Sequence, residues 1–131
     1  MAEDGPRIRR APIPDDAALV IRGDGGLEQT RRRAQLFRDR YRGWQRWGVS
    51  AFYVRSDSEV DDLAQERLHP FPTLRLYDIS VLHQAGLEVV PTFRTPHVTI
   101  AWSGDLDEGL RILEVVRFEE RENPYHESLD T

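Results

Sequence analysis

The chain has 131 residues, a net charge of −5 and no cysteine, which fits one domain and excludes disulfides and thiolate metal sites. Its first residues, Met1–Arg7, lack the apolar stretch of a signal peptide, and no apolar run is long enough to span a bilayer. We therefore expect a cytoplasmic protein that makes no use of a membrane.

The positive charge is concentrated in one part of the chain. All 18 basic Lys/Arg positions are arginine, and seven of them fall between Arg31 and Arg46, where Asp39 is the single acid. The rest of the chain is acidic. A basic patch on an acidic protein is a candidate binding surface for phosphate groups or for an acidic protein partner.

A strand and then the clearest helix are predicted after a polar, proline-containing N-terminal arm at residues 1–16. The β-branched run at residues 18–22 reads as a strand that ends in a glycine-rich breaker. Apolar and aromatic residues then recur at steps of three and four, which predicts a helix with one apolar stripe. The stripe comprises Leu27, Thr30, Ala34, Phe37, Tyr41 and Trp44. Asp24 is its candidate N-cap, and Gly43 and Gly48 end it.

Short strands and helices alternate through the rest of the chain, as strand composition, helical stripes and glycine and proline breakers indicate. They are a strand at 49–54, a helix at 56–68, a strand at 74–77, a helix at 78–85, a β-hairpin within 86–102 and a helix at 106–117. The order β-α-β-α-β-α-β-β-α indicates the α+β class. We expect a single mixed α/β layer sandwich over residues 17–118, in which the βα alternation allows parallel neighbours. Residues 119–131 are predicted to be an acidic tail.

His97 carries most of the signal for a chemical function. Strand side chains alternate, so His97 and Thr99 share one face of the second hairpin strand, which Pro96 introduces by holding Thr95 extended. An imidazole that titrates near neutrality can transfer protons. We expect His97 and Thr99 to be catalytic, and Thr99 and Arg94 to contact phosphate. The structural alternative is a histidine that hydrogen-bonds a loop carbonyl at the start of a strand.

Arg22 lies where the first predicted strand meets the loop Gly23-Asp24-Gly25-Gly26. A glycine-rich loop that opens a helix can hold phosphate, although this glycine spacing differs from that of a dinucleotide-binding motif and a tight turn is the alternative. We expect Arg22 to bind substrate, and Arg31, Arg32 and Arg38 of the following helix to attract a phosphate backbone. The alternative for the arginines of this helix is that they form an ordinary solvent-exposed face that binds no phosphate.

Two short resemblances support an RNA-directed function. Pro96-His97-Val98-Thr99-Ile100 resembles one half of the His-x-Thr signature of the two-histidine phosphoesterases, but the chain has no second such motif. Leu82–Leu87, followed by the hairpin and His97, is similar to the helix–glycine–strand–histidine arrangement of HicA-type toxins. Those proteins cleave messenger RNA on a fold like that of double-stranded-RNA-binding domains; they have a serine-like residue where this chain has Pro96, and they are shorter.

A third resemblance concerns the first two predicted strands. Arg22 at the end of one strand and Ser50 in the next resemble the arginine and serine placement of ADP-ribosyltransferases. Those enzymes also need a catalytic glutamate, which no motif marks in this chain.

Two functions follow from the sequence. The first is a small intracellular, toxin-like enzyme that acts on RNA or a nucleotide with His97 as general acid/base. The alternative is a non-catalytic protein-binding module, one half of a protein pair, that uses the arginine-rich helix or the acidic tail. Metal-ligand spacing, nucleophile motifs and cofactor motifs are missing from the sequence, so we expect neither a metal nor a cofactor.

Overall fold

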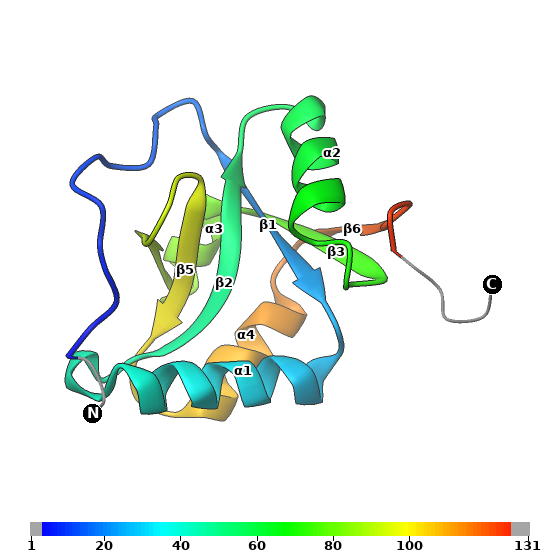
Figure 1. Cartoon of the computed structure of the whole chain (residues 1–131). Helices are drawn as coiled ribbons and strands as arrows, with labels where there is room; N and C mark the ends of the chain where they lie inside the picture. The colour runs from blue at the N-terminus through cyan, green and yellow to red at the C-terminus, as the bar shows by residue number, and fades with distance from the viewer. Residues whose placement is uncertain (1–3, 127–131) are drawn as a thin grey trace.

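The computed structural model describes residues 4–126, and in this part the chain forms a six-stranded sheet with four α-helices (Figure 1). The elements are β1 (Leu19–Asp24), α1 (Leu27–Arg40), the 3₁₀ helix η1 (Arg42–Trp44), β2 (Trp47–Val54), α2 (Asp57–Glu66), β3 (Thr73–Asp78), α3 (Ile79–Gln84), β4 (Glu88–Pro91), β5 (His97–Trp102), α4 (Leu106–Val115) and β6 (Glu119–Glu122). The predicted α+β class and the predicted order of elements through α4 are confirmed. No helix of the described residues is both long enough and apolar enough to cross a bilayer.

The strands lie in the order β4-β5-β2-β1-β3-β6, and every neighbouring pair is antiparallel. The parallel neighbours that the βα alternation allowed therefore do not occur in this sheet. The reason is visible at α1, which crosses the end of the sheet instead of running back along a face (Figure 1). A strand that follows such a helix starts beside the end of the previous strand and runs antiparallel to it.

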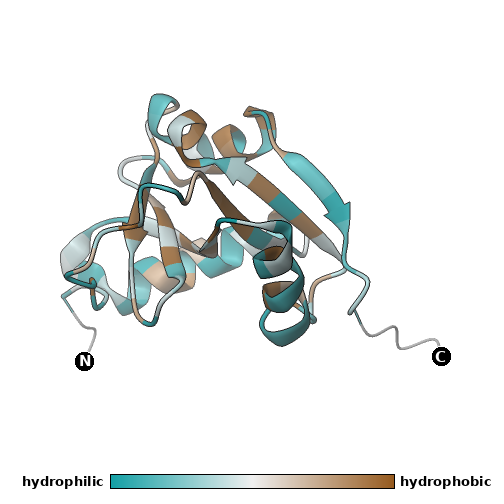
Figure 2. Ribbon diagram, turned by 90° about the horizontal axis from the view of Figure 1, so that it is seen from above, coloured by the Kyte–Doolittle hydropathy of each residue, from teal (hydrophilic) through white to brown (hydrophobic). Residues whose placement is uncertain are grey.

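Side-chain alternation along the strands divides the interior into two cores, one on each face of the sheet. The first core packs against α3 and α4 and includes Val20, Ala51, Tyr53, Tyr77, Leu82, Val98, Ile100, Trp102, Leu110 and Leu113. The second packs against α2 and includes Ile21, Phe52, Val54, Val60, Leu63, Ala64, Leu74 and Leu76. Hydrophobic residues accordingly recur along the central strands in Figure 2. His97 and Thr99 alternate with residues of the first core, so they face the side of α2.

Strands β1 and β2 pair over only part of their length. The first three residues of β1 pair with the last three of β2, and Ile21 opposite Phe52 is the last pair. Beyond it, β1 continues along β3 and β2 continues along β5. The two strands therefore diverge toward α1, which runs across the open end (Figure 1).

The first helix starts and ends differently from its prediction. It ends at Arg40, and the last predicted turn is instead η1, which includes Trp44. Gly26, with a φ of 99°, is the N-cap residue. Asp24, the predicted N-cap, does not cap the helix. Its carboxylate instead accepts a hydrogen bond from the Gly26 N–H (3.0 Å) and pairs with Arg75 (3.2 Å).

Both ends of the described chain pack against the sheet. In the predicted N-terminal arm, Ile8 forms a β-bridge with Thr92. At the other end, Glu119–Glu122 forms β6 and pairs with β3, although its composition predicted the start of a tail. Backbone pairing with β3 holds this strand, which consists of hydrophilic residues and forms an edge of the sheet (Figure 2). Of the predicted arm and tail, residues 1–3 and 127–131 lie outside the described part.

The packing of α4 predicts that Gly109→Ala destabilises the protein. A Cβ atom at Gly109 would overlap the buried indole of Trp102. We expect the free energy of unfolding to fall by about 1–3 kcal/mol through overpacking, despite the roughly 1 kcal/mol by which alanine favours a helix over glycine. Urea denaturation measures the change. Arg111→Ala, at an exposed position of α4, is the control, and a stabilised Gly109→Ala variant would contradict this packing.

Candidate functional site

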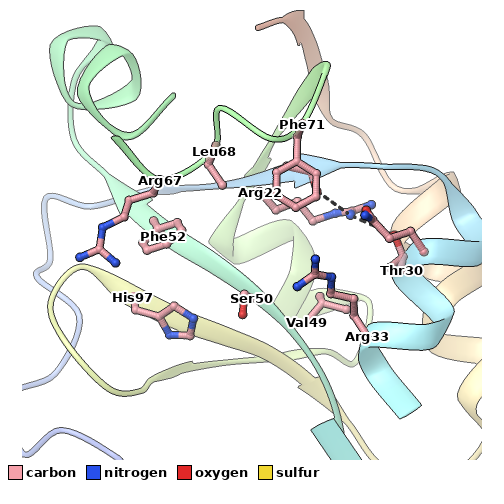
Figure 3. Close-up of a pocket in the computed structure, with 12 residues that line it drawn as sticks. Arg22, Thr30, Arg33, Val49, Ser50, Phe52, Arg67, Leu68, Phe71 and His97 are labelled. Atoms are coloured by element: carbon pink, nitrogen blue, oxygen red, sulfur yellow. Dashed lines mark hydrogen bonds between the residues drawn. The ribbon is translucent and has the colours of Figure 1, made fainter. Parts of the chain in front are cut away.

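A hollow of about 210 Å³ lies where β1 and β2 diverge. We call it the β1–β2 hollow. Its walls come from five parts of the chain: Arg22 and Gly23 from β1; Gln29, Thr30 and Arg33 from α1; Val49, Ser50 and Phe52 from β2; Arg67, Leu68 and Phe71 from the end of α2 and the loop after it; and His97 from β5. Figure 3 shows these side chains around the opening. Three arginines and one histidine line it, and no aspartate or glutamate does.

Arg22 is a buried cation in this wall without an acidic partner. Its residue exposure is 3%, and its Nη1 makes only long contacts, to Gly23 O (3.3 Å) and Thr30 Oγ1 (3.4 Å). Its Nε and Nη2 have no hydrogen-bond partner among the described residues. The Tyr77 ring lies nearby, with its centroid 5.9 Å from Cζ, but carries no negative charge. A buried guanidinium in this state carries an uncompensated desolvation cost.

Arg33 and Arg67 add positive charge at the rim of the β1–β2 hollow, where both are exposed. Arg33 Cζ lies 5.9 Å from the ring centroid of Phe71, and Arg67 Cζ lies 6.0 Å from that of Phe52. These cation–π contacts place the guanidinium groups beside the apolar parts of the wall. An anion that entered would meet exposed arginines first and the buried Arg22 last.

His97 is half-buried between aromatic rings, with ring centroids 5.3 Å from Phe52 and 5.2 Å from Phe93. Its Nδ1 lies 2.9 Å from Thr92 Oγ1 and 3.2 Å from Thr92 O. A carbonyl oxygen can only accept, so the second contact places a proton on Nδ1. In the neutral ring Nε2 is then left as a proton acceptor.

The surroundings of His97 keep its imidazole neutral. Burial is the largest influence that lowers the pKa of His97 below its ordinary value of 6.5, and the charges of Arg9 and Arg67 lower it further, while the hydrogen bond to the Thr92 backbone raises it. Because the unfolded chain binds this proton more readily, the contribution of His97 to folding stability is fully present above pH 6.5 and is lost as the pH drops from there through the lowered pKa.

Thr99 does not line the β1–β2 hollow. It is 1% exposed, and its Oγ1 lies 2.7 Å from Thr92 Oγ1, which in turn contacts His97. The position therefore does not support the predicted contact of Thr99 with phosphate. Thr99 instead fixes Thr92, which orients the imidazole.

Arg9 of the N-terminal arm holds the loop of the hairpin. Its Nη1 donates to Thr92 O (2.7 Å) and to His97 O (2.6 Å). The arm backbone adds hydrogen bonds from Arg9 N to Pro91 O (2.8 Å) and from Phe93 N to Arg7 O (2.9 Å). Arg9 thus joins the two ends of the loop that leads to His97.

The other predicted substrate-binding arginines lie outside the β1–β2 hollow. Arg94 is exposed in the hairpin loop, and Arg32 is exposed on α1. Arg31 pairs with Asp107 of α4 and with Glu28. Arg38 stacks on Trp47, with its Cζ 4.4 Å from the ring centroid. These helix arginines therefore differ in their surroundings, since Arg31 and Arg38 have partners on other elements and Arg32 is exposed.

Sequence reasoning did not assign Arg33, Arg67, Thr30 or Thr92 to the site. Arg33 belongs to the same arginine run as the predicted residues, and helical phase relative to the buried Thr30 is the signal that separates it from them. Arg67 had no sequence signal, because the loop after α2 reaches His97 only through the tertiary fold. Arg22 and His97, both predicted, do line one hollow.

Comparisons of the chain with protein families, with curated proteins and with solved structures find no match.

The contacts of the arm predict that Arg9→Gln raises the pKa of His97. The positive charge of Arg9 disfavours the imidazolium, and its removal should move the pKa upward, though not fully to the ordinary value because burial remains. NMR titration of the ring protons measures this directly. Arg10→Gln, at an exposed position of the same arm, should leave the titration unchanged. A pKa that stays constant or falls in Arg9→Gln would show that Arg9 does not act on the ring.

Proposed function

We propose that the protein is an enzyme that binds a phosphorylated substrate, RNA or a nucleotide, in the β1–β2 hollow and uses His97 as general acid/base. The observation that carries the proposal is the buried, unpartnered guanidinium of Arg22 in a wall that also contains His97. The hairpin resembles part of the HicA-type toxins, which cleave messenger RNA, and of the two-histidine phosphoesterases, which act on phosphate esters.

The charge of the wall favours an anion. A lone buried ion costs on the order of several kcal/mol, and in this chain no ion pair of the described residues involves Arg22. A ligand that brings negative charge would remove this cost. Guanidinium groups bind phosphate through paired, charge-assisted hydrogen bonds, and the buried Nε and Nη2 of Arg22 have no hydrogen-bond partner among the described residues.

The size and the apolar part of the wall favour a nucleotide. Pockets for drug-sized ligands span about 300–1,000 Å³, so a hollow of about 210 Å³ holds one nucleotide unit or less at a time. Phe52 and Phe71 supply aromatic surface, on which bases stack without regard to sequence. A double helix does not fit such a volume, which favours single-stranded RNA or a free nucleotide.

His97 is suited to accept a proton. Its Nδ1 is held by Thr92, so proton exchange with a ligand falls to Nε2. The lowered pKa keeps the ring neutral at pH 7, the state in which it acts as a base. In an RNA substrate the proton would come from a ribose hydroxyl or from water.

Replacing Arg22 should separate binding from stability. Arg22→Gln removes an uncompensated buried charge, so the free energy of unfolding should be unchanged or higher, whereas affinity for adenosine monophosphate should fall by roughly tenfold or more. Isothermal titration calorimetry and urea denaturation measure the two effects. Arg111→Gln on α4 matches the change of charge at an exposed position and should alter neither. Equal affinities in the two variants would contradict the proposed anion site.

Replacing His97 should abolish turnover while binding persists. His97→Asn retains a polar side chain beside Thr92 but cannot transfer protons, so the rate should fall by about 10²–10⁴-fold. The assay follows single-stranded RNA and a panel of nucleotides by chromatography, with His83→Asn, at an exposed position of α3, as the control. Equal rates for the two variants would remove His97 from the chemistry. Binding without turnover in the unmodified protein would favour the non-catalytic alternative.

A further inference from the structure

We infer that the β1–β2 hollow contains two separate subsites, and that the one at Arg22 holds a terminal phosphate, a phosphomonoester, while the neighbouring part of the substrate lies at His97. The inference rests on the proposed function for the role of His97, but the phosphate subsite stands on its own geometry.

The strand register separates the two residues. His97 pairs with Phe52, and Phe52 pairs with Ile21, so these three residues form one rung across β5, β2 and β1. With about 4.8 Å between neighbouring strands, the Cα atoms of His97 and Ile21 lie roughly 10 Å apart, and Arg22 is the next residue of β1. Figure 3 shows Arg22 and His97 on opposite sides of Ser50.

The side chains also point to different parts of the wall. Arg22 reaches toward α1, where its Nη1 lies 3.4 Å from Thr30 Oγ1, while His97 lies against Phe52 and Phe93. One phosphate group therefore cannot contact both Arg22 and the ring of His97 in this arrangement. A substrate that uses both must extend from one subsite to the other.

The Arg22 subsite is a closed end. Arg22 is 3% exposed, and its neighbours Thr30 and Val49 are 6% and 5% exposed. A phosphodiester continues on both sides, and one of those sides would have to pass through this buried wall. A phosphomonoester ends there, and its second negative charge suits the two guanidinium groups of Arg22 and Arg33. The rim, formed by Arg33, Arg67 and Ser50, is exposed and gives the rest of the substrate a way out.

The test compares three ribodinucleotides: one with a 5′-phosphate, one with a 3′-phosphate and one with neither. Calorimetric titration into the His97→Asn variant measures binding without turnover. We expect one of the phosphorylated dinucleotides to bind roughly tenfold or more tightly than the unphosphorylated one. Arg22→Gln should abolish this preference. Arg22→Lys should weaken it, because the ammonium group is a point charge and cannot form the paired hydrogen bonds of a planar guanidinium. The control variant Arg111→Gln should keep the preference.

The outcomes separate this inference from the proposed function. A preference for a terminal phosphate that depends on Arg22, without turnover in the unmodified protein, supports the phosphate subsite and removes the role of His97. Turnover of dinucleotides at equal rates and affinities, whatever their ends carry, supports the enzyme and overturns the subsite. Equal and weak binding of all three, with circular dichroism showing folded variants, overturns both.

Discussion

The early separation of β1 from β2 is the constraint on which the rest of the site depends. Both strands keep their outer partners, so the sheet remains continuous while its centre opens toward α1. Arg22 is the first residue of β1 beyond the last pair with β2, and its guanidinium occupies the opening. A full-length pairing would have placed strand backbone where the β1–β2 hollow now lies. The unpartnered charge of Arg22 is thus a consequence of the sheet geometry.

His97 is held by a second set of contacts, which does not involve Arg22. Thr92 contacts Nδ1 of His97, Thr99 contacts Thr92, and Arg9 bonds the carbonyl groups of Thr92 and His97. The orientation of the ring is therefore determined by a buried network and a distant arm, while burial and the charges of Arg9 and Arg67 favour its neutral form. Such a network orients an imidazole as the supporting groups of known acid/base sites do. Phe52 connects the opening between β1 and β2 with the contacts around His97, because it contacts the His97 ring and belongs to the last β1–β2 pair.

The arginine-rich helix shows how a charge run divides on folding. Arg31 pairs with Asp107 of α4, and Arg38 stacks on Trp47 of β2, so part of the apparent basic patch fastens α1 to its neighbours. Arg33 alone of the run reaches the β1–β2 hollow. Local composition reports the charge of a segment, but the partner of each side chain depends on helical phase and on elements far along the chain.

The sequence by itself determined the α+β class, the order of elements through α4 and the two residues, Arg22 and His97, that proved to share one hollow. These follow from local rules, since periodicity, breakers and strand alternation act over a few residues. Only the tertiary structure decided the antiparallel sheet, the strand at Glu119–Glu122, the burial of Thr99 and the entry of Arg67 into the wall. Each depends on backbone pairing or packing between segments distant in the chain, where side-chain composition carries little information about the partner.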